Sequence, residues 1–220
     1  MMIPAIETGF EGVRLYPGLL SPAAQNSLYQ ALLTAGARRD AYRPLMPRTA
    51  RPWSITQFNL GPLGWVSDAS GYRYQATHPV TGLAWPAMPP MLPRLWNALT
   101  GYPAPPECCL VNLYGDPKAR MGLHQDRDEA ALDAPVLSLS LGDTCVFRVG
   151  GFARRDASRS FKLASGDALI MGGASRLRFH GVDRVIPGTS RLLEGGGRWN
   201  LTLRRVSLPG EQGPQPGACQ

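Results

Sequence analysis

The sequence predicts an α+β fold in which a β-rich C-terminal half is supported by helices from the N-terminal half. Three observations carry this prediction. From residue 108 onward, short segments with alternating or β-branched residues follow one another and are separated by turn residues. Two earlier segments have apolar residues at helical spacing. With 44% hydrophobic and 18% charged residues in a chain of 220, the composition is typical of one globular domain with a sizeable core.

Two helices are predicted in the N-terminal half. Ser21 and Pro22 are typical of an N-cap and a first helical position, and apolar residues at helical spacing follow until Gly36. The segment MLPRLWNALTG also has an apolar side and ends at Gly101. We expect both helices to pack against a sheet. Between them, residues 40–90 are rich in Pro, Gly and aromatic residues without steady periodicity, so we expect an irregular, functional segment.

The C-terminal half contains seven predicted strands: CCLVNLY, PVLSLSL, TCVFRV, SFKL, DALIMG, RLRFHGV and RWNLTLRRV. Gly142 and Gly166, each followed by Asp, predict turns. In the sixth segment we expect His180 to end the strand formed by RLRFH. Short strands with such turns indicate an antiparallel barrel or sandwich. Residues 207–220 are rich in Gly, Pro and Gln, and we expect a disordered tail there.

The basic character of the chain favours an anionic partner. The formal net charge is +7, and Lys118 and Lys162 are the only lysines among 23 basic residues. Arginine suits phosphate and carboxylate, so nucleic acid is the leading candidate, although an arginine bias also arises from coding composition. The four cysteines lack zinc-type spacing and predict reduced thiols. Without a leader-like or membrane-spanning apolar run, we expect a cytoplasmic protein that does not contact membranes.

The stretch HQDRDE is the strongest candidate for a metal site. His124 and Asp126 are separated by one residue, so an extended or turning backbone can point both side chains the same way. His180 supplies a second imidazole after the RLRF run. Two imidazoles and one carboxylate on one face of a metal form the site of non-haem Fe(II) oxygenases. Taken alone, the pair is also compatible with a solvated acidic loop.

The last predicted strand, RWNLTLR, has one apolar and one polar face. Period two places Arg198, Asn200, Thr202 and Arg204 together, about 6.5 Å apart per two-residue step. Two guanidinium groups at such spacing can grip both ends of a short dicarboxylate. A sheet with a wet outer face is the alternative. The strand CCLVNLY likewise places polar residues on one face, and such residues would line a barrel interior: Asn112 and Tyr114, together with Leu110.

Several motifs occur in one order over residues 10–206, and together the chain resembles the bacterial AlkB dioxygenases. These motifs are LGW at 63–65, GYRY at 71–74, WPAMP at 85–89, NLY at 112–114, LHQDRDE at 123–129, SLSLG at 138–142, GGxxR at 150–154, GGASRLRFHG at 172–181 and RWNLTLR at 198–204. The resemblance implies a double-stranded β-helix (jelly-roll) core at 108–206. It also implies helices and a nucleotide-recognition lid at 1–107, the two parts forming one domain.

The resemblance further implies the ligand sets of the site. Fe(II) would be held by His124, Asp126 and His180. The co-substrate 2-oxoglutarate would chelate that iron, O2 being the second co-substrate. Its C1 end would be assisted by Arg204 and Asn112, whereas the far carboxylate would pair with Arg198, helped by Tyr114 and Asn200.

On the substrate side, the resemblance implies oxidative demethylation of bases such as 1-methyladenine and 3-methylcytosine in alkylated, single-stranded DNA, with RNA as an alternative, by a monomeric protein. The residues assigned to the base and its phosphate are Trp65, Tyr72, Asp128 and Arg154. The lid segment 51–59 lacks the methionines expected there and offers Trp53 and Gln57, which leaves lesion and strand preference open. Two alternatives remain: a dioxygenase acting on protein or a small molecule, and a non-catalytic nucleic-acid-binding barrel.

Overall fold

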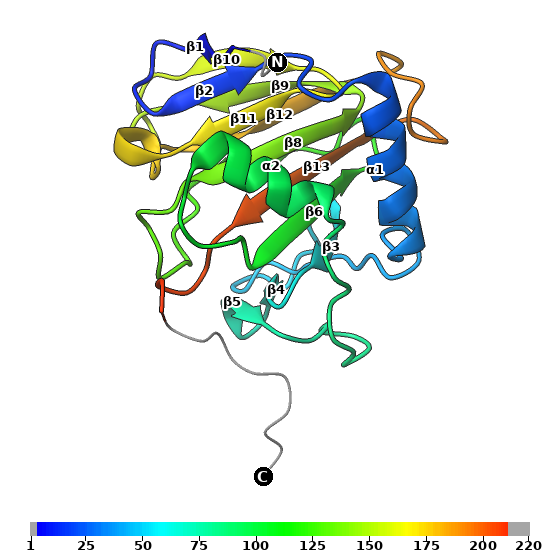
Figure 1. Cartoon of the computed structure of the whole chain (residues 1–220). Helices are drawn as coiled ribbons and strands as arrows, with labels where there is room; N and C mark the ends of the chain where they lie inside the picture. The colour runs from blue at the N-terminus through cyan, green and yellow to red at the C-terminus, as the bar shows by residue number, and fades with distance from the viewer. Residues whose placement is uncertain (1–3, 211–220) are drawn as a thin grey trace.

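Two antiparallel β-sheets packed face to face form the core of the computed structural model, which describes residues 4–210 (Figure 1). The large sheet has the order β1(Ile6–Glu7), β2(Val13–Tyr16), β11(Ala168–Met171), β8(Val136–Gly142), β13(Arg198–Arg204), β6(Cys108–Tyr114) and β3(Thr56–Leu60). The small sheet has the order β10(Arg159–Leu163), β9(Thr144–Val149), β12(His180–Ile186) and β7(Met121–His124). This arrangement confirms the predicted α+β fold with a double-stranded β-helix core.

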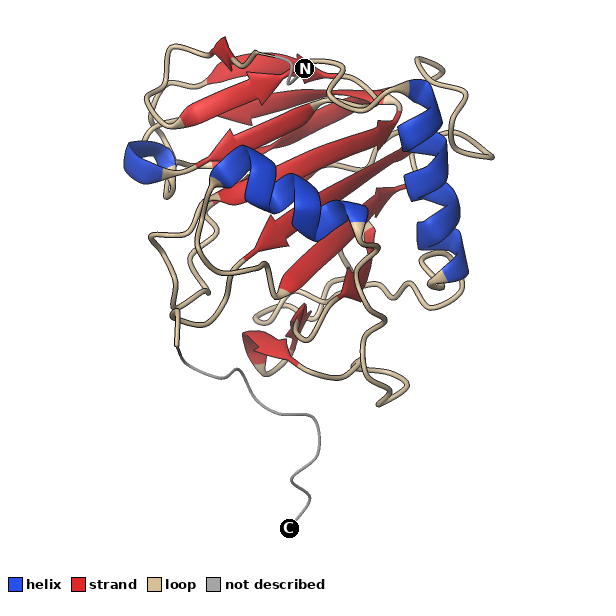
Figure 2. Cartoon of the chain, viewed as in Figure 1, coloured by secondary structure: helices blue, strands red, loops and turns tan. Residues whose placement is uncertain are grey.

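The two predicted helices are present and cover the outer face of the large sheet (Figure 2). Helix α1(Pro22–Thr34) begins at the N-cap Ser21, whose side chain accepts a hydrogen bond from the Ala24 amide at 3.3 Å. Helix α2(Met91–Thr100) ends at Gly101, whose φ of 64° is the left-handed conformation that glycine adopts without strain. Leu32 and Trp96 pack into the same apolar cluster as the leucines of the sheet, which anchors both helices.

Alternation along the central strands separates an apolar outer face from a polar interior. In β13, Trp199, Leu201 and Leu203 pack under the helices. Arg198, Asn200, Thr202 and Arg204 occupy the alternate positions, and three of them line the cavity between the sheets. In β8, Ser138 and Ser140 alternate with leucines in the same way. The polar face is therefore the barrel interior, as the sequence predicted.

The prediction that His180 ends a strand is wrong, because His180 begins β12. The residues before it form a 3₁₀ turn (Gly173–Ser175) and a second turn closed by the Arg178 amide, which donates to the Ser175 carbonyl at 3.1 Å. Arg176 points inward and is 4% exposed. The segment RLRF therefore forms a tight turn, although its alternating sequence predicts a strand. One of its arginines, Arg176, is buried.

The expectation of an irregular segment at 40–90 is only partly confirmed. It contains β3 and the separate hairpin β4(Gly64–Asp68) and β5(Gly71–Gln75). The sequence did not predict β3, because four of its five residues are buried and its polar and apolar residues therefore do not separate into an exposed and a buried face. It pairs with β6, and β2 pairs with β11, so the part of the chain before residue 108 extends the large sheet on both sides.

Three observations concern the remaining expectations. Cys108, Cys109 and Cys145 are buried free thiols, and Cys219 lies outside the described residues. Most of the tail expected at 207–220 also lies outside them, since description ends at residue 210. Across residues 4–210, no helix has the length and apolar character needed to cross a membrane.

Candidate active site

Strand pairing brings the two histidines of the candidate metal site together. His124 ends β7 and His180 begins β12, and the two are direct partners in the antiparallel register. Their ring centroids lie 4.5 Å apart. Gly181 permits this close pairing, because a Cβ there would lie 2.5 Å from the Met121 carbonyl oxygen. A larger residue at 181 would push the two ligand-bearing strands apart.

The three predicted iron ligands His124, Asp126 and His180 form one cluster whose ligand atoms all lie within 4.8 Å of one another. Each imidazole presents Nε2 to the carboxylate, at 3.6 Å from Oδ1 for His124 and 3.7 Å from Oδ2 for His180. The Nδ1 atoms lie 2.9 and 3.0 Å from the backbone carbonyls of Gly122 and Arg178. Donation from Nδ1–H to these carbonyls leaves the Nε2 lone pairs free for a metal.

The charge states of the cluster suit a divalent metal. Burial is the main cause that lowers the pKa of His180 to about 4, so its imidazole is neutral at neutral pH. Burial alone would raise the pKa of Asp126, but the positive charge of Arg204, the largest opposing cause, outweighs it and holds this pKa below its ordinary value. Neutral imidazoles and an ionised carboxylate are the forms that coordinate iron.

Arg204 lies beside the candidate iron ligands, and one of its nitrogen donors has no hydrogen-bond partner. Its Nη2 lies 2.9 Å from Oδ1 of Asp126, and its Nε lies 3.2 Å from Oδ2 of Asp126 and 3.4 Å from Oε1 of Glu129. Nη1 is buried and has no partner. This orphaned donor in the cavity fits an additional carboxylate next to the metal.

Two residues that the sequence analysis missed support this corner of the site. Glu129 is 5% exposed and pairs with Arg176, whose Nη2 lies 3.0 Å from Oε2. Arg176 also donates from Nη1 to the Asp126 carbonyl at 2.5 Å and from Nε to the Ala134 carbonyl at 2.8 Å. The hydroxyl of Tyr74 donates to Glu129. The only hint in the sequence was the acidic run HQDRDE, to which Glu129 belongs. The structure shows that Glu129 is too deeply buried to be part of a solvated loop.

Arg198 is fully buried and has no carboxylate partner among the described residues. Its exposure is 0%, and it donates only to neutral acceptors: the carbonyls of Asp143 and Leu163, Ser140 Oγ and Asn200 Oδ1. Its Nε has no acceptor. A buried guanidinium without an anion is costly. The free carboxylate of a small dicarboxylate would supply the missing charge, so this residue fits 2-oxoglutarate.

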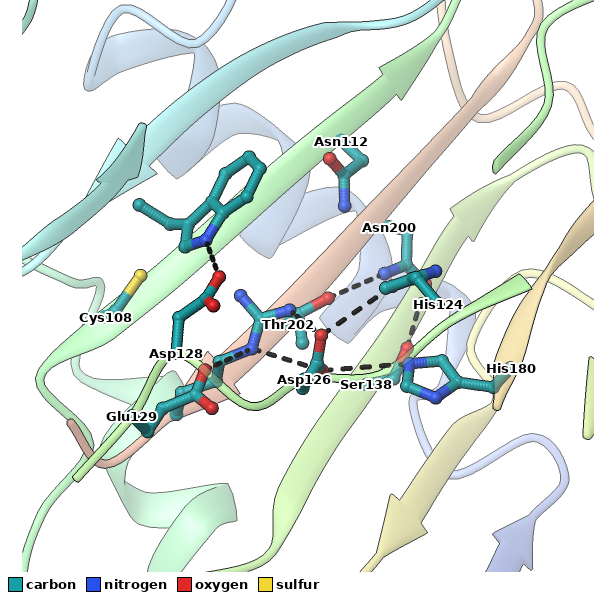
Figure 3. A network of polar contacts seen from close by, with 12 residues as sticks. Cys108, Asn112, His124, Asp126, Asp128, Glu129, Ser138, His180, Asn200 and Thr202 are labelled. Carbon is teal, nitrogen blue, oxygen red and sulfur yellow. Dashed lines mark hydrogen bonds and ion pairs between the residues drawn. The ribbon is translucent and has the colours of Figure 1, made fainter. Parts of the chain in front are cut away.

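The amides and the hydroxyl predicted to assist the co-substrate lie in the same interior. Asn112 and Asn200 are register partners on β6 and β13 and line the cavity with Tyr114 (Figure 3 shows the two amides). Burial raises the pKa of Tyr114, which keeps its hydroxyl protonated as a donor. Asn200 is already bonded within the protein, since its Oδ1 accepts from Ser138 and its Nδ2 donates to Thr202.

The four residues predicted to bind substrate lie at the exposed side of the cavity. The rings of Trp65 and Tyr72 are stacked, with centroids 5.4 Å apart and planes 19° apart. Trp65 donates from Nε1 to Oδ2 of Asp128 at 2.8 Å. Arg154 is exposed, donates to the Leu123 carbonyl, and lies 5.1 Å from the ring centroid of Phe179. All four line the cavity that His124, Asp126 and His180 also line.

A double-stranded β-helix whose interior holds two histidines and an aspartate, an arginine with a free donor and a second arginine without a carboxylate partner defines the class of Fe(II)- and 2-oxoglutarate-dependent dioxygenases. A family model described as the 2OG-Fe(II) oxygenase superfamily matches residues 12–204. The chain is 54% identical over 207 residues to the alpha-ketoglutarate-dependent dioxygenase AlkB homolog of Caulobacter vibrioides, covering 93% of this chain and 92% of that protein. It is 40% identical over 157 residues to the alpha-ketoglutarate-dependent dioxygenase AlkB of Escherichia coli (strain K12), covering 70% and 72% of the two chains.

The solved structure of OsALKBH1 is also similar, with a TM-score of 0.80, 30% identity and coverage of 92% of this chain and 100% of that chain. The chain therefore belongs to the AlkB family. It is an Fe(II)- and 2-oxoglutarate-dependent dioxygenase with the metal triad His124, Asp126 and His180.

Proposed function

We propose that this dioxygenase removes methyl groups from 1-methyladenine and 3-methylcytosine in single-stranded DNA. The balanced reaction consumes O2, 2-oxoglutarate and the N-methylated base. One oxygen atom enters succinate as CO2 is lost, and the other converts the N-methyl group to N-hydroxymethyl. The hydroxymethyl group then loses its O–H proton as the carbon–nitrogen bond breaks, so that the bonding electron pair stays on the ring nitrogen and formaldehyde is released.

A single cavity carries this proposal. Its volume is about 270 Å³, and it is lined both by the metal triad and by Trp65, Tyr72 and Asp128. An aromatic face and a carboxylate both stabilise a cationic base, and 1-methyladenine and 3-methylcytosine are cationic. Methylation at these positions weakens base pairing, which lowers the cost of placing the base in a pocket. A net charge of +7 favours a polyanionic substrate.

In the proposed site, Fe(II) bound to the triad supplies the oxidation of the methyl group by O2, with 2-oxoglutarate as the electron source. Arg204 donates from its free Nη1 to the C1 carboxylate, and Asn112 assists there. Arg198 pairs with the far carboxylate, next to the Tyr114 hydroxyl. Asn200 acts indirectly: its Oδ1 accepts a hydrogen bond from Arg198 at 3.4 Å and so holds that side chain in place. Its Nδ2 already donates to Thr202 and is not free for the co-substrate.

On the base side, Trp65 provides the stacking face and orients Asp128 through the indole hydrogen bond. The carboxylate of Asp128 then faces the exocyclic amine of the base. Tyr72, whose exposure is 52%, presents its hydroxyl to the phosphate backbone, and Arg154 contacts the nucleotide at the rim. This arrangement would direct the methyl group toward His124, Asp126 and His180, which line the same cavity.

Formaldehyde release across matched single-stranded and double-stranded DNA and RNA oligonucleotides, each with one methylated base, tests the proposal. We expect the fastest release from single-stranded DNA with 1-methyladenine or 3-methylcytosine, and none from unmethylated controls. Preference for the RNA series would assign RNA as the substrate. Succinate formation with indifference to every oligonucleotide would contradict the proposal and favour a protein or small-molecule substrate.

A further inference from the structure

Gln57 connects the lid segment to the interior of the barrel. It lies on the edge strand β3 directly opposite Asn112 of β6, and its exposure is 0%. Its Nε2 donates to Asn112 Oδ1 at 2.9 Å, and it lines the cavity that contains the metal triad. Its own Oε1 is buried without a partner.

This hydrogen bond decides which way the Asn112 amide points. An asparagine amide has one acceptor oxygen and one donor nitrogen on opposite sides. Because Oδ1 accepts from Gln57, Nδ2 must face away from β3. In Figure 3 the amide nitrogen is on the side of Asn200 and the triad, and no described residue accepts a hydrogen bond from it. Nδ2 is therefore available to a bound acceptor.

Simple packing does not account for a glutamine at this position. A buried carbonyl oxygen without a partner carries a desolvation cost that one neutral amide–amide hydrogen bond offsets only in part. An apolar side chain of similar length would fill the same space without that cost. The amide at position 57 therefore has a polar task, and its only described side-chain partner is Asn112.

We propose that Gln57 is a positioning residue for 2-oxoglutarate: it holds the Asn112 amide with Nδ2 toward the co-substrate carboxylate, so that the lid segment and the co-substrate site are linked. The inference rests on the proposed role of Asn112 at the C1 end. Gln57 itself acts through Asn112.

Two substitutions at position 57 separate this role from packing. Gln57→Glu changes one atom, replacing the donor by an acceptor, so that the Asn112 amide must turn Oδ1 toward the co-substrate. Gln57→Met only removes the hydrogen bond to Asn112, so that the Asn112 amide can take either orientation. We expect the Kd for 2-oxoglutarate to rise about 10-fold or more in Gln57→Glu, since a hydrogen bond to a charged group is replaced by repulsion, and about 3-fold in Gln57→Met. If packing alone mattered, the nearly isosteric Gln57→Glu would be the milder change.

The measurement is calorimetric titration of 2-oxoglutarate into the Mn(II)-loaded protein, which requires no turnover. Mn(II) affinity and the melting temperature of each variant report whether the fold and metal site are intact. Ser54→Ala, in the same segment but bonded to the Arg120 carbonyl, is the matched control and should bind 2-oxoglutarate like the wild type. Gln57→Met also serves if Gln57→Glu does not fold.

A double-mutant cycle with Asn112→Ala completes the test. If Gln57 acts through Asn112, Gln57→Met weakens 2-oxoglutarate binding in the wild type and has no further effect in the Asn112→Ala background. Equal weakening in both backgrounds would overturn the inference. Unchanged affinity in Asn112→Ala alone would instead overturn the proposed role of Asn112, whereas weaker binding in Asn112→Ala with wild-type affinity in both Gln57 variants would overturn only the coupling.

Discussion

Arg198 carries a buried positive charge that no carboxylate neutralises within residues 4–210. Such a charge destabilises the protein without its co-substrate and is compensated when a carboxylate binds. We predict that Arg198→Met leaves the melting temperature of the ligand-free protein unchanged or raised. The same change should weaken 2-oxoglutarate binding by about 30-fold or more, because breaking a buried charge pair costs roughly 2–5 kcal/mol. Thermal melts and calorimetry with Mn(II) measure both effects.

The opposite result would identify Arg198 as a structural residue. In that case the ligand-free variant would melt well below the wild type, and the ligand-induced increase in melting temperature would persist. Lys162 on β10, at the solvent-exposed side of the small sheet, provides the control: Lys162→Met removes a charge of the same sign with no effect on 2-oxoglutarate affinity.

Trp65 has two contacts whose roles can be separated, its ring face and its indole nitrogen. We predict that Trp65→Ala weakens binding of a methylated oligonucleotide by roughly 5- to 100-fold, since stacking of one base contributes about 1–3 kcal/mol. Trp65→Phe keeps a stacking face but loses the hydrogen bond to Asp128, so its effect should be smaller. Fluorescence anisotropy with a labelled oligonucleotide gives the affinities. Normal affinity in Trp65→Ala would exclude the stacking role, while Mn(II) binding should be unchanged in both variants.

At the same scale, the sequence could predict the residues whose positions follow from spacing. His124 and Asp126 follow from a two-residue separation, and Arg198 and Arg204 from the period of one strand. Glu129 and Arg176 could not be identified in this way, because their burial depends on an ion pair between segments 47 residues apart. The hydrogen bond between Gln57 and Asn112 could not be predicted either, since β3 is buried on both faces and its sequence shows no strand alternation.

At the level of elements, the β4–β5 hairpin presents Trp65 and Tyr72 and is closed by an ion pair. Asp68 accepts two hydrogen bonds from Arg73, at 3.0 and 2.8 Å. The Arg73 hydrogen bond is the main cause that lowers the pKa of Asp68 from 3.8 to about 2. Because the folded-state pKa lies below the unfolded value, the stabilisation is complete above about pH 4 and is lost as the pH falls through about 2.

We therefore predict that Asp68→Asn lowers the free energy of unfolding at pH 7 by at most about 1 kcal/mol, since both side chains are more than a third exposed and solvent screens the pair. The difference from wild type should shrink between pH 4 and pH 2 and in high salt. Urea denaturation at several pH values measures it. A difference that stays constant with pH would show that the charge of Asp68 is not the cause. Amide hydrogen exchange should increase in β4 and β5 before it increases elsewhere.

The elements themselves were predictable where one face of a strand or helix is buried. β6, β8 and β13 and both helices have that character, and the capping residues Ser21 and Gly101 mark helix boundaries. The turn before β12 has the sequence alternation of a strand because Arg176 points inward there. A local pattern cannot distinguish a buried arginine from an exposed one, because the difference lies in partners that are distant in sequence.

On the scale of the whole molecule, the proposed ligands connect the two sheets. His124 and His180 belong to the small sheet, whereas Arg198 and Arg204 belong to the large sheet. A metal alone therefore joins strands β7 and β12 and the loop that carries Asp126. A 2-oxoglutarate that chelates the metal and pairs with both arginines ties one sheet to the other. Stabilisation by the two ligands together should exceed the sum of their separate effects.

We predict that Mn(II) at about 100 times its Kd raises the free energy of unfolding by about 2.7 kcal/mol, and that 2-oxoglutarate at about 100 times its Kd for the Mn(II)-loaded protein adds about 2.7 kcal/mol more. Together the two ligands should raise the melting temperature by about 10–20 °C. 2-Oxoglutarate without metal should raise the melting temperature only slightly, because it can still pair with the two arginines but has no metal to chelate. In Arg198→Met, the increase caused by Mn(II) should persist while the further increase caused by 2-oxoglutarate is lost. Differential scanning calorimetry of the four ligand combinations measures these terms. Additive effects in the wild type would mean that the two ligands bind independently, and the sheets would then not be linked through them.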